Sequence, residues 1–131
     1  MTERLVFDAG ALIALERNDR QMWARLRIAA RDEIDVVVPT AVLAQVWRGT
    51  ARQARLAQAL KKTKPGSFDV LAKAAGELCH AAGTADPIDA SVALAAARTE
   101  CVIYTDDLPD IRHLVRSLPR GEGTRVTVRL A

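Results

Sequence analysis

Short apolar runs, rich in β-branched residues, alternate along this chain with stretches that carry helical patterns. The runs lie at residues 5–7, 34–38, 101–104 and 126–128. Strands that alternate with helices predict an α/β fold, a mostly parallel sheet of about four to five strands flanked by helices on both faces. In such a sheet, ligands bind outside the carboxyl ends of the strands.

The segments between these runs are expected to be helical. Hydrophobic periodicity predicts an alanine-rich helix ending near Gly83 and further helices at about 11–17, 20–32, 40–47, 51–62, 87–98 and 108–117. Asp86 and Pro87 mark one helix start, because Asp is a good N-cap and Pro suits the first helical position. We interpret residues 64–66 as a loop and residues 68–70 as a candidate short strand.

The size and composition fit one globular domain over residues 1–131. Half of the residues are apolar and 27% are charged, as in an ordinary soluble protein. No apolar run approaches the ~18 residues that a bilayer span needs. The charged start, with Glu3 and Arg4, does not resemble a signal peptide. We therefore expect a cytoplasmic protein that does not associate with membranes.

The cysteines and histidines do not indicate a disulfide bond or a zinc site. Cys79 and Cys101 are interpreted as buried thiols, as is usual for two cysteines in a cytoplasmic chain. His80 and His113 have no Cys or His companions at ligand spacing. Aromatic residues make up only 4% of the chain, which argues against a platform for stacking bases.

Four acidic or amide side chains fall where a parallel sheet would bring them together. Asp8 and Asp107 each follow an apolar run, Gln45 lies in the helix after the second run, and Asp89 opens a later helix. Two carboxylates about 4 Å apart repel by roughly 4 kcal/mol at an effective dielectric near 20. Such a cluster therefore predicts a site for Mg²⁺ or Mn²⁺, which prefer oxygen ligands.

Each of these residues also has a purely structural explanation. Asp8 and Asp86 are suitable helix caps, and Asp89 complements the dipole of the helix it opens. Asp107 and Asp110 fit turns, and Gln45 fits an exposed helix position. These alternatives remain open at the level of the sequence.

Basic residues are concentrated beside the candidate site, although the net charge is only +3. Residues 46–64 contain no acid and six basic residues: Arg48, Arg52, Arg55, Lys61, Lys62 and Lys64. A helix continuous past Gly49 would place Gln45, Arg48 and Arg52 on one face, where the two arginines would position phosphates. We therefore interpret Arg48, Arg52 and Arg55 as candidate contacts to a polyanion such as RNA, with a solvated face as the alternative.

Four segments together resemble the PIN-domain family, specifically the VapC-type toxin ribonucleases of toxin–antitoxin pairs. They are residues 6–12, 38–49, 85–90 and 102–107, and they occur in the family's order over essentially the whole chain. No single motif among them is specific. The ordered set of four segments is more specific to the family. It includes Pro87 two residues before Asp89, and Thr105 two residues before Asp107.

The resemblance implies a role for each candidate residue. Asp8, Asp89 and Asp107 match three metal-binding acids of the family, Asp86 and Asp110 match accessory acids, and Gln45 stands where glutamate is usual. The family implies Mg²⁺- or Mn²⁺-dependent endonucleolytic cleavage of structured RNA such as tRNA or ribosomal RNA. It also implies a homodimer, and inhibition by a VapB-type antitoxin whose tail enters the acidic groove.

The amide at Gln45 leaves two functions open. A carbonyl oxygen binds a cation more weakly than a carboxylate and cannot accept a proton, so we expect weaker metal binding and reduced activity or a one-ion site. Thr105 is expected to hydrogen-bond one of the acids or a bound water. The alternative function is a catalytically weak PIN-like module that binds RNA or an antitoxin without turnover.

Two other α/β classes with clustered aspartates do not fit. A phospho-acceptor receiver domain needs an acidic pair after the first strand and a late lysine, but Ala9 and Gly10 follow Asp8, and no lysine follows Lys73. A phosphatase that forms an aspartyl-phosphate needs a second Asp where this chain has Gly10.

Overall fold

Five parallel strands form the central sheet of the computed structural model, which describes residues 1–131. The spatial order of the strands is β3-β2-β1-β4-β5, and every neighbouring pair is parallel. The strands are β1 (Arg4–Phe7), β2 (Asp35–Pro39), β3 (Lys64–Gly66), β4 (Cys101–Thr105) and β5 (Val126–Leu130). The predicted parallel α/β sheet is confirmed, and the predicted final strand lies at an edge.

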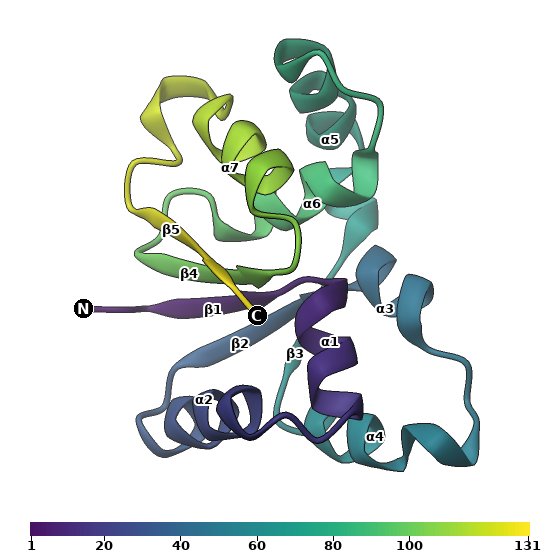
Figure 1. Ribbon diagram of the computed structural model, residues 1–131. Coiled ribbons are helices and arrows are strands. Elements are labelled where there is room, and N and C mark those ends of the chain that lie inside the picture. The colour runs from purple at the N-terminus through teal and green to yellow at the C-terminus, as the bar shows by residue number, and fades with distance from the viewer.

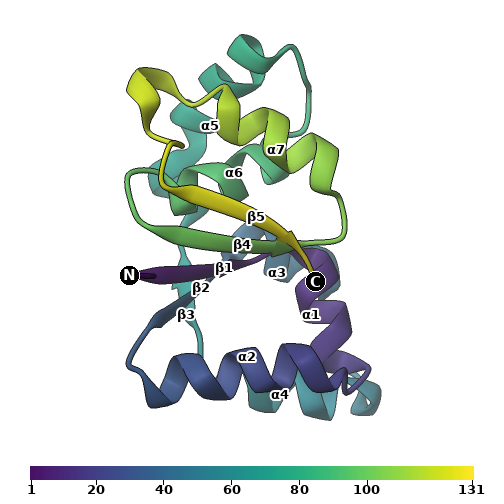
Figure 2. The ribbon, with the colours of Figure 1, turned by 60° about the vertical axis from the view of Figure 1, so that its left-hand side comes forward.

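Helices cover both faces of this sheet. They are α1 (Ala9–Glu16), α2 (Arg20–Arg31), α3 (Thr40–Val46), α4 (Ala54–Leu60), α5 (Phe68–Ala82), α6 (Pro87–Ala96) and α7 (Leu108–Arg116), with 3₁₀ turns η1 (Ala51–Gln53) and η2 (Pro119–Gly121). Figure 1 shows α1, α2 and α4 on one side of the sheet and α6 and α7 on the other, with α5 beside α6. The same layers are visible after rotation in Figure 2. None of the helices is both long enough and apolar enough to span a bilayer.

The two central strands are buried because helices pack on both of their faces. Val6, Phe7 and Ile103 are fully buried, and the ring of Phe7 meets that of Tyr104 edge to face, with centroids 6.1 Å apart. Cys101 is buried and unpaired, and this burial raises the pKa of its thiol to about 12. These contacts fix β1 and β4 side by side, and both strands end at the same edge of the sheet.

Two local predictions between residues 64 and 70 are wrong. Residues 64–66, interpreted as a loop, form the short edge strand β3, which pairs only with β2. Proline is tolerated there because an edge strand has one side without a ladder. Residues 68–70, interpreted as a strand, begin α5, where the N–H of Phe68 donates to Oγ1 of Thr40 at 3.1 Å.

Gly10 allows the first helix to lie close to the end of β4. A Cβ atom at Gly10 would lie 2.7 Å from the Cβ of Asp106 and 2.8 Å from its backbone nitrogen. We expect Gly10→Ala to lower the free energy of unfolding by about 1–3 kcal/mol, because backbone as well as side chain must move. Urea unfolding measures the change.

The matched control for this prediction is Gly76→Ala. Gly76 lies inside α5, and a Cβ atom there meets nothing within 4 Å. The control should raise the free energy of unfolding by up to about 1 kcal/mol, because alanine is the better helix former. Equal effects at the two positions would contradict the close packing at Gly10.

Candidate metal centre

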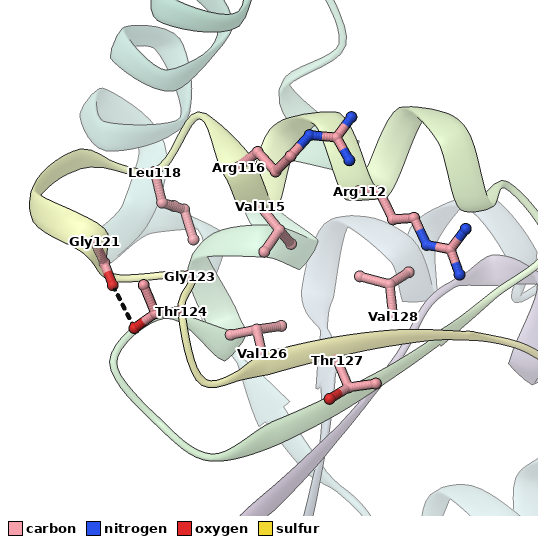
Figure 3. A pocket seen from close by; sticks show the side chains of 10 residues that line it. All are labelled: Arg112, Val115, Arg116, Leu118, Gly121, Gly123, Thr124, Val126, Thr127 and Val128. Carbon is pink, nitrogen blue, oxygen red and sulfur yellow. Dashed lines mark hydrogen bonds between the residues drawn. The ribbon is translucent and has the colours of Figure 1, made fainter.

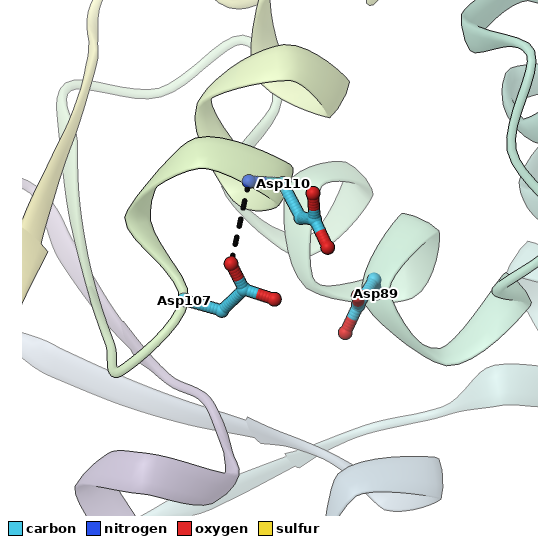
Figure 4. A group of neighbouring side chains, drawn as sticks. All are labelled: Asp89, Asp107 and Asp110. Atoms are coloured by element: carbon cyan, nitrogen blue, oxygen red, sulfur yellow. Dashed lines mark hydrogen bonds between the residues drawn. The ribbon is translucent and has the colours of Figure 1, made fainter.

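Three carboxylates meet at the carboxyl edge of the sheet. Asp89 lies in the first turn of α6, Asp107 is the N-cap of α7, and Asp110 follows in the first turn of α7. One carboxylate oxygen from each lies within 4.8 Å of the others, and Figure 4 shows the three side chains facing a common space. The structure therefore brings together two of the predicted metal-binding acids and one predicted accessory acid.

Asp8 lies next to this group rather than within it. Its side chain is only 5% exposed, because it follows the buried strand β1. The hydroxyl of Thr105 donates to its Oδ2 at 2.8 Å, and the N–H of Ala9 donates to its Oδ1 at 2.7 Å. Asp8 thus also caps α1, the structural role that the sequence left open.

Thr105 connects two of the acids. It is fully buried at the end of β4, and its Oγ1 accepts a hydrogen bond from the N–H of Asp107 at 3.0 Å while its hydroxyl donates to Asp8. A hydroxyl has one proton to donate and lone pairs to accept, so both bonds are satisfied together. Thr105 therefore fixes where Asp107 leaves the sheet relative to Asp8.

The cluster carries more negative charge than its surroundings neutralise. Burial, and then the charges of Asp86, Asp8, Asp107 and Asp110, raise the pKa of Asp89 to about 7. Burial also raises the pKa of Asp8, although the bonds from Thr105 and Ala9 oppose this. A hydrogen bond to Asp107 and its charge raise the pKa of Asp110.

The donor set fits a small divalent cation. Mg²⁺ and Mn²⁺ bind carboxylate oxygens and need only a few from the protein, since water and substrate supply the rest. A cation would relieve the repulsion that, together with the larger effect of burial, keeps the pKa of Asp89 high. Asp89, Asp107 and Asp110 are the residues placed to hold it.

Asp86 acts on this cluster from the helix start. Its side chain is exposed, and its Oδ1 accepts hydrogen bonds from the N–H groups of Ile88 at 3.0 Å and Asp89 at 3.1 Å. It is thus the N-cap of α6, with Pro87 at the first helical position, as the sequence pattern indicated. The cap orients the turn that carries Asp89.

The basic segment does not have the predicted helical arrangement. α3 ends at Val46, Trp47 is extended, and Gly49 has a left-handed φ of 71°. The helix is therefore not continuous past Gly49, and Gln45, Arg48 and Arg52 do not share one helix face. Gln45 is exposed on the last turn of α3.

The three candidate arginines lie in different environments. The guanidinium of Arg48 donates to the carbonyl oxygens of Trp47 at 2.7 Å and Ala44 at 3.2 Å, so it folds back onto the end of α3. Arg52 lies in η1 and Arg55 in α4, and both side chains are exposed. Of the three, Arg52 and Arg55 remain free to meet a polyanion.

A buried amide that sequence reasoning missed holds the end of α3. Gln53 is 5% exposed, and its Oε1 accepts from the N–H groups of Arg48 at 2.7 Å and Gly49 at 3.1 Å. Its Nε2 donates to Oε1 of Glu16 and to the carbonyl oxygen of Val46, both at 2.8 Å. The signal in the sequence was a polar residue on the apolar side of the segment that continues through Leu56.

Removing this amide is expected to destabilise the protein. Gln53→Ala leaves two N–H groups and a carbonyl oxygen without their partner, so we expect a loss of about 1–3 kcal/mol in the free energy of unfolding. Gln58→Ala, at an exposed position of α4, is the control and should change it little. Chemical denaturation of both variants tests this, and similar losses would contradict the assigned role.

The chain was compared with known proteins by sequence and by structure. A scan against protein-family models finds no match, and a search of curated proteins by sequence finds none. By structure, the chain is similar to a chain in the crystal structure of VapBC2 from Rickettsia felis bound to a DNA fragment from their promoter. The TM-score is 0.66, at 14% sequence identity over 98% of both chains. With five parallel strands in this order and this structural likeness, the chain has the PIN-like fold that its sequence predicts.

Proposed function

We propose that this protein is a toxin ribonuclease of the VapC type, which hydrolyses phosphodiester bonds of structured RNA with Mg²⁺ or Mn²⁺. The observation that carries the proposal is the convergence of Asp89, Asp107 and Asp110 at the carboxyl edge, beside the buried carboxylate of Asp8. The PIN-like fold supports it, because ligands of parallel sheets bind at this edge. tRNA and ribosomal RNA are the substrate classes that we propose.

Each residue has a distinct task in the proposed reaction. A bound divalent cation supplies neutralisation of the phosphoryl oxygens and activation of a water nucleophile. Asp89, Asp107 and Asp110 would hold that cation with Asp8 beside them as a further ligand, while Thr105 keeps Asp107 in place relative to Asp8. Gln45 offers a neutral carbonyl oxygen from α3.

Basic residues outside the acid cluster bind the RNA backbone in this proposal. Arg52 and Arg55 are exposed beyond the end of α3, and their charge attracts phosphates without reading bases. We also propose that the protein is cytoplasmic, forms a homodimer and is inhibited by a VapB-type antitoxin. The likeness to a chain of a VapBC complex supports the antitoxin as a partner.

The amide at Gln45 supports a second candidate function. A cluster with one carboxylate fewer binds a cation more weakly, and the side chain cannot accept a proton. Under this alternative, the protein is a catalytically weak module that binds RNA or an antitoxin without turnover.

Cleavage of total cellular RNA tests the proposal. Purified, antitoxin-free protein should produce discrete fragments with Mn²⁺ or Mg²⁺ and none with EDTA. Asp107→Asn should abolish them, since it removes a ligand but keeps a residue that caps α7 equally well. Glu77→Gln, an exposed position in the middle of α5, should cleave normally.

The outcomes separate the two functions. Fragments that need metal and vanish with Asp107→Asn support the nuclease. The absence of cleavage under every condition contradicts it and favours the binding module.

A further inference from the structure

A groove of about 630 Å³ lies between α7 and β5, on the part of the sheet away from α3 and α4. We call it the β5 groove. Figure 3 shows aliphatic side chains pointing into it, namely Val115, Leu118, Val126 and Val128. Arg112 and Arg116 line it along α7. The β5 groove thus combines an apolar floor with a basic rim.

The floor of the groove ends at an open sheet edge. β5 is the last strand and pairs only with β4. The carbonyl of Arg125 and the N–H of Ala131 both bond to β4, so the backbone groups of the alternate residues Val128 and Leu130 point away from it. Leu130 is 58% exposed and Val128 only 7%, so this edge presents backbone donors and acceptors mainly at Leu130, beside an apolar surface.

The charges of the groove are not neutralised within the chain. No ion pair in the structure involves Arg112 or Arg116. Arg112 follows Asp110 by two residues, about 200° around α7, so the metal-site acids lie on the opposite side of the helix. The two guanidinium groups are thus available to a partner.

This charge distinguishes between the partners that an open edge attracts. A second copy of the chain, paired through β5, would bring the same arginines against these and would meet repulsion. An extended segment gains ion pairs instead if the side chains on its groove-facing side include carboxylates, and aliphatic side chains on the same side fit the apolar floor.

We propose that the β5 groove binds an acidic, extended peptide segment that adds to β5 as a sixth strand. Backbone hydrogen bonds to Val128 and Leu130 provide the pairing, and Arg112 and Arg116 select carboxylates. This surface is separate from the acid cluster, so the proposal does not rest on the nuclease function.

Binding of a defined peptide tests the proposal. The probe is a fluorescein-labelled nonapeptide in which valine and glutamate alternate at every second position, with threonine between them, so that both lie on the face that meets the groove. It is compared with a version in which lysine replaces glutamate. Fluorescence anisotropy should detect binding of the acidic peptide alone, weakening as salt rises. Arg112→Glu with Arg116→Glu should weaken it at least tenfold, about 1.4 kcal/mol or more.

A charge-matched control separates the groove from the overall charge of the protein. Arg20→Glu with Lys73→Glu changes the net charge equally, at exposed positions of α2 and α5. Its affinity for the acidic peptide should stay within about twofold of the unaltered protein. An equal loss in both double variants would overturn the proposal.

A second variant tests the strand pairing itself. Leu130→Pro removes an N–H that points away from β4, so β5 keeps its own ladder, and peptide binding should fall at least tenfold. Leu130→Ala should bind within about threefold. Amide hydrogen exchange should slow at Val128 and Leu130 when the acidic peptide is added.

Three further results would overturn the proposal. They are no binding of the acidic peptide, binding that is insensitive to Leu130→Pro, and a free protein that sediments as a dimer with Val128 and Leu130 already protected. The last result would assign the edge to a second copy of the chain.

Discussion

Replacing Asp89 by asparagine is expected to abolish metal-dependent RNA cleavage and, in the same molecule, to stabilise the metal-free fold. The loss of activity should be at least about a hundredfold, because a direct ligand of the proposed cation is removed. The gain in stability follows from the pKa of Asp89, which burial and then repulsion by the neighbouring carboxylates raise from 3.8 to about 7.

The sign of the stability change depends on pH. Because the folded state keeps this proton to a higher pH than the unfolded chain, folding becomes less favourable as pH rises from about 4 to about 7. Asparagine does not ionise, so the variant keeps its stability as pH rises through this range. For a half-buried group partly screened by water, we expect Asp89→Asn to gain about 1–2 kcal/mol at pH 8 in EDTA.

Thermal unfolding with EDTA measures this gain. The difference between Asp89→Asn and the unaltered protein should be largest at pH 8 and should shrink toward pH 4. Adding Mn²⁺ should stabilise the unaltered protein more than the variant, because binding to the folded state alone raises stability. A variant that is less stable at pH 8 in EDTA would contradict the repulsion at Asp89.

Gln45→Glu is expected to increase RNA cleavage by about tenfold to a hundredfold. A glutamate supplies the charge that the resemblance to VapC-type ribonucleases leads us to expect at this position, and changes in residues that support a metal site alter affinity or activity on this scale. Initial cleavage rates and calorimetric titration with Mn²⁺ measure the two effects. Because Gln45 is exposed on α3, the substitution should leave the fold unchanged.

Gln58→Glu adds the same charge on an exposed face of α4 and is the control. It should leave both the cleavage rate and the affinity for Mn²⁺ as they are. If neither the unaltered protein nor Gln45→Glu cleaved any RNA, the result would contradict the nuclease function and favour the binding module.

The order of strands and helices along the chain could be predicted from the sequence because the central strands are mostly apolar. β1 and β4 are covered on both faces, so their residues form continuous runs that stand out from helical patterns. β3 could not be predicted in this way. Its residues Lys64, Pro65 and Gly66 resemble a turn, and they become a strand only because β2 offers a free edge.

The candidate site could be predicted only as a set of acids at one edge. Their positions just after the strands in the sequence predict that they lie at the carboxyl edge of the sheet. Which carboxylates face one another depends on side-chain contacts that the sequence does not show. Asp8 turns toward Thr105, 97 residues away, while Asp110 joins the cluster. Gln53 was missed because its partner Glu16 lies 37 residues away and is brought near only by the folded chain.

The bond between Thr105 and Asp8 joins the beginning of the domain to its last third. During synthesis Thr105 leaves the ribosome 97 residues after Asp8, so the growing chain has no completed acidic cluster over that interval. Contacts between such distant segments also slow folding. For a protein proposed to attack the RNA of the translation machinery, this connectivity delays the appearance of a working site until β4 and the start of α7 have been synthesised.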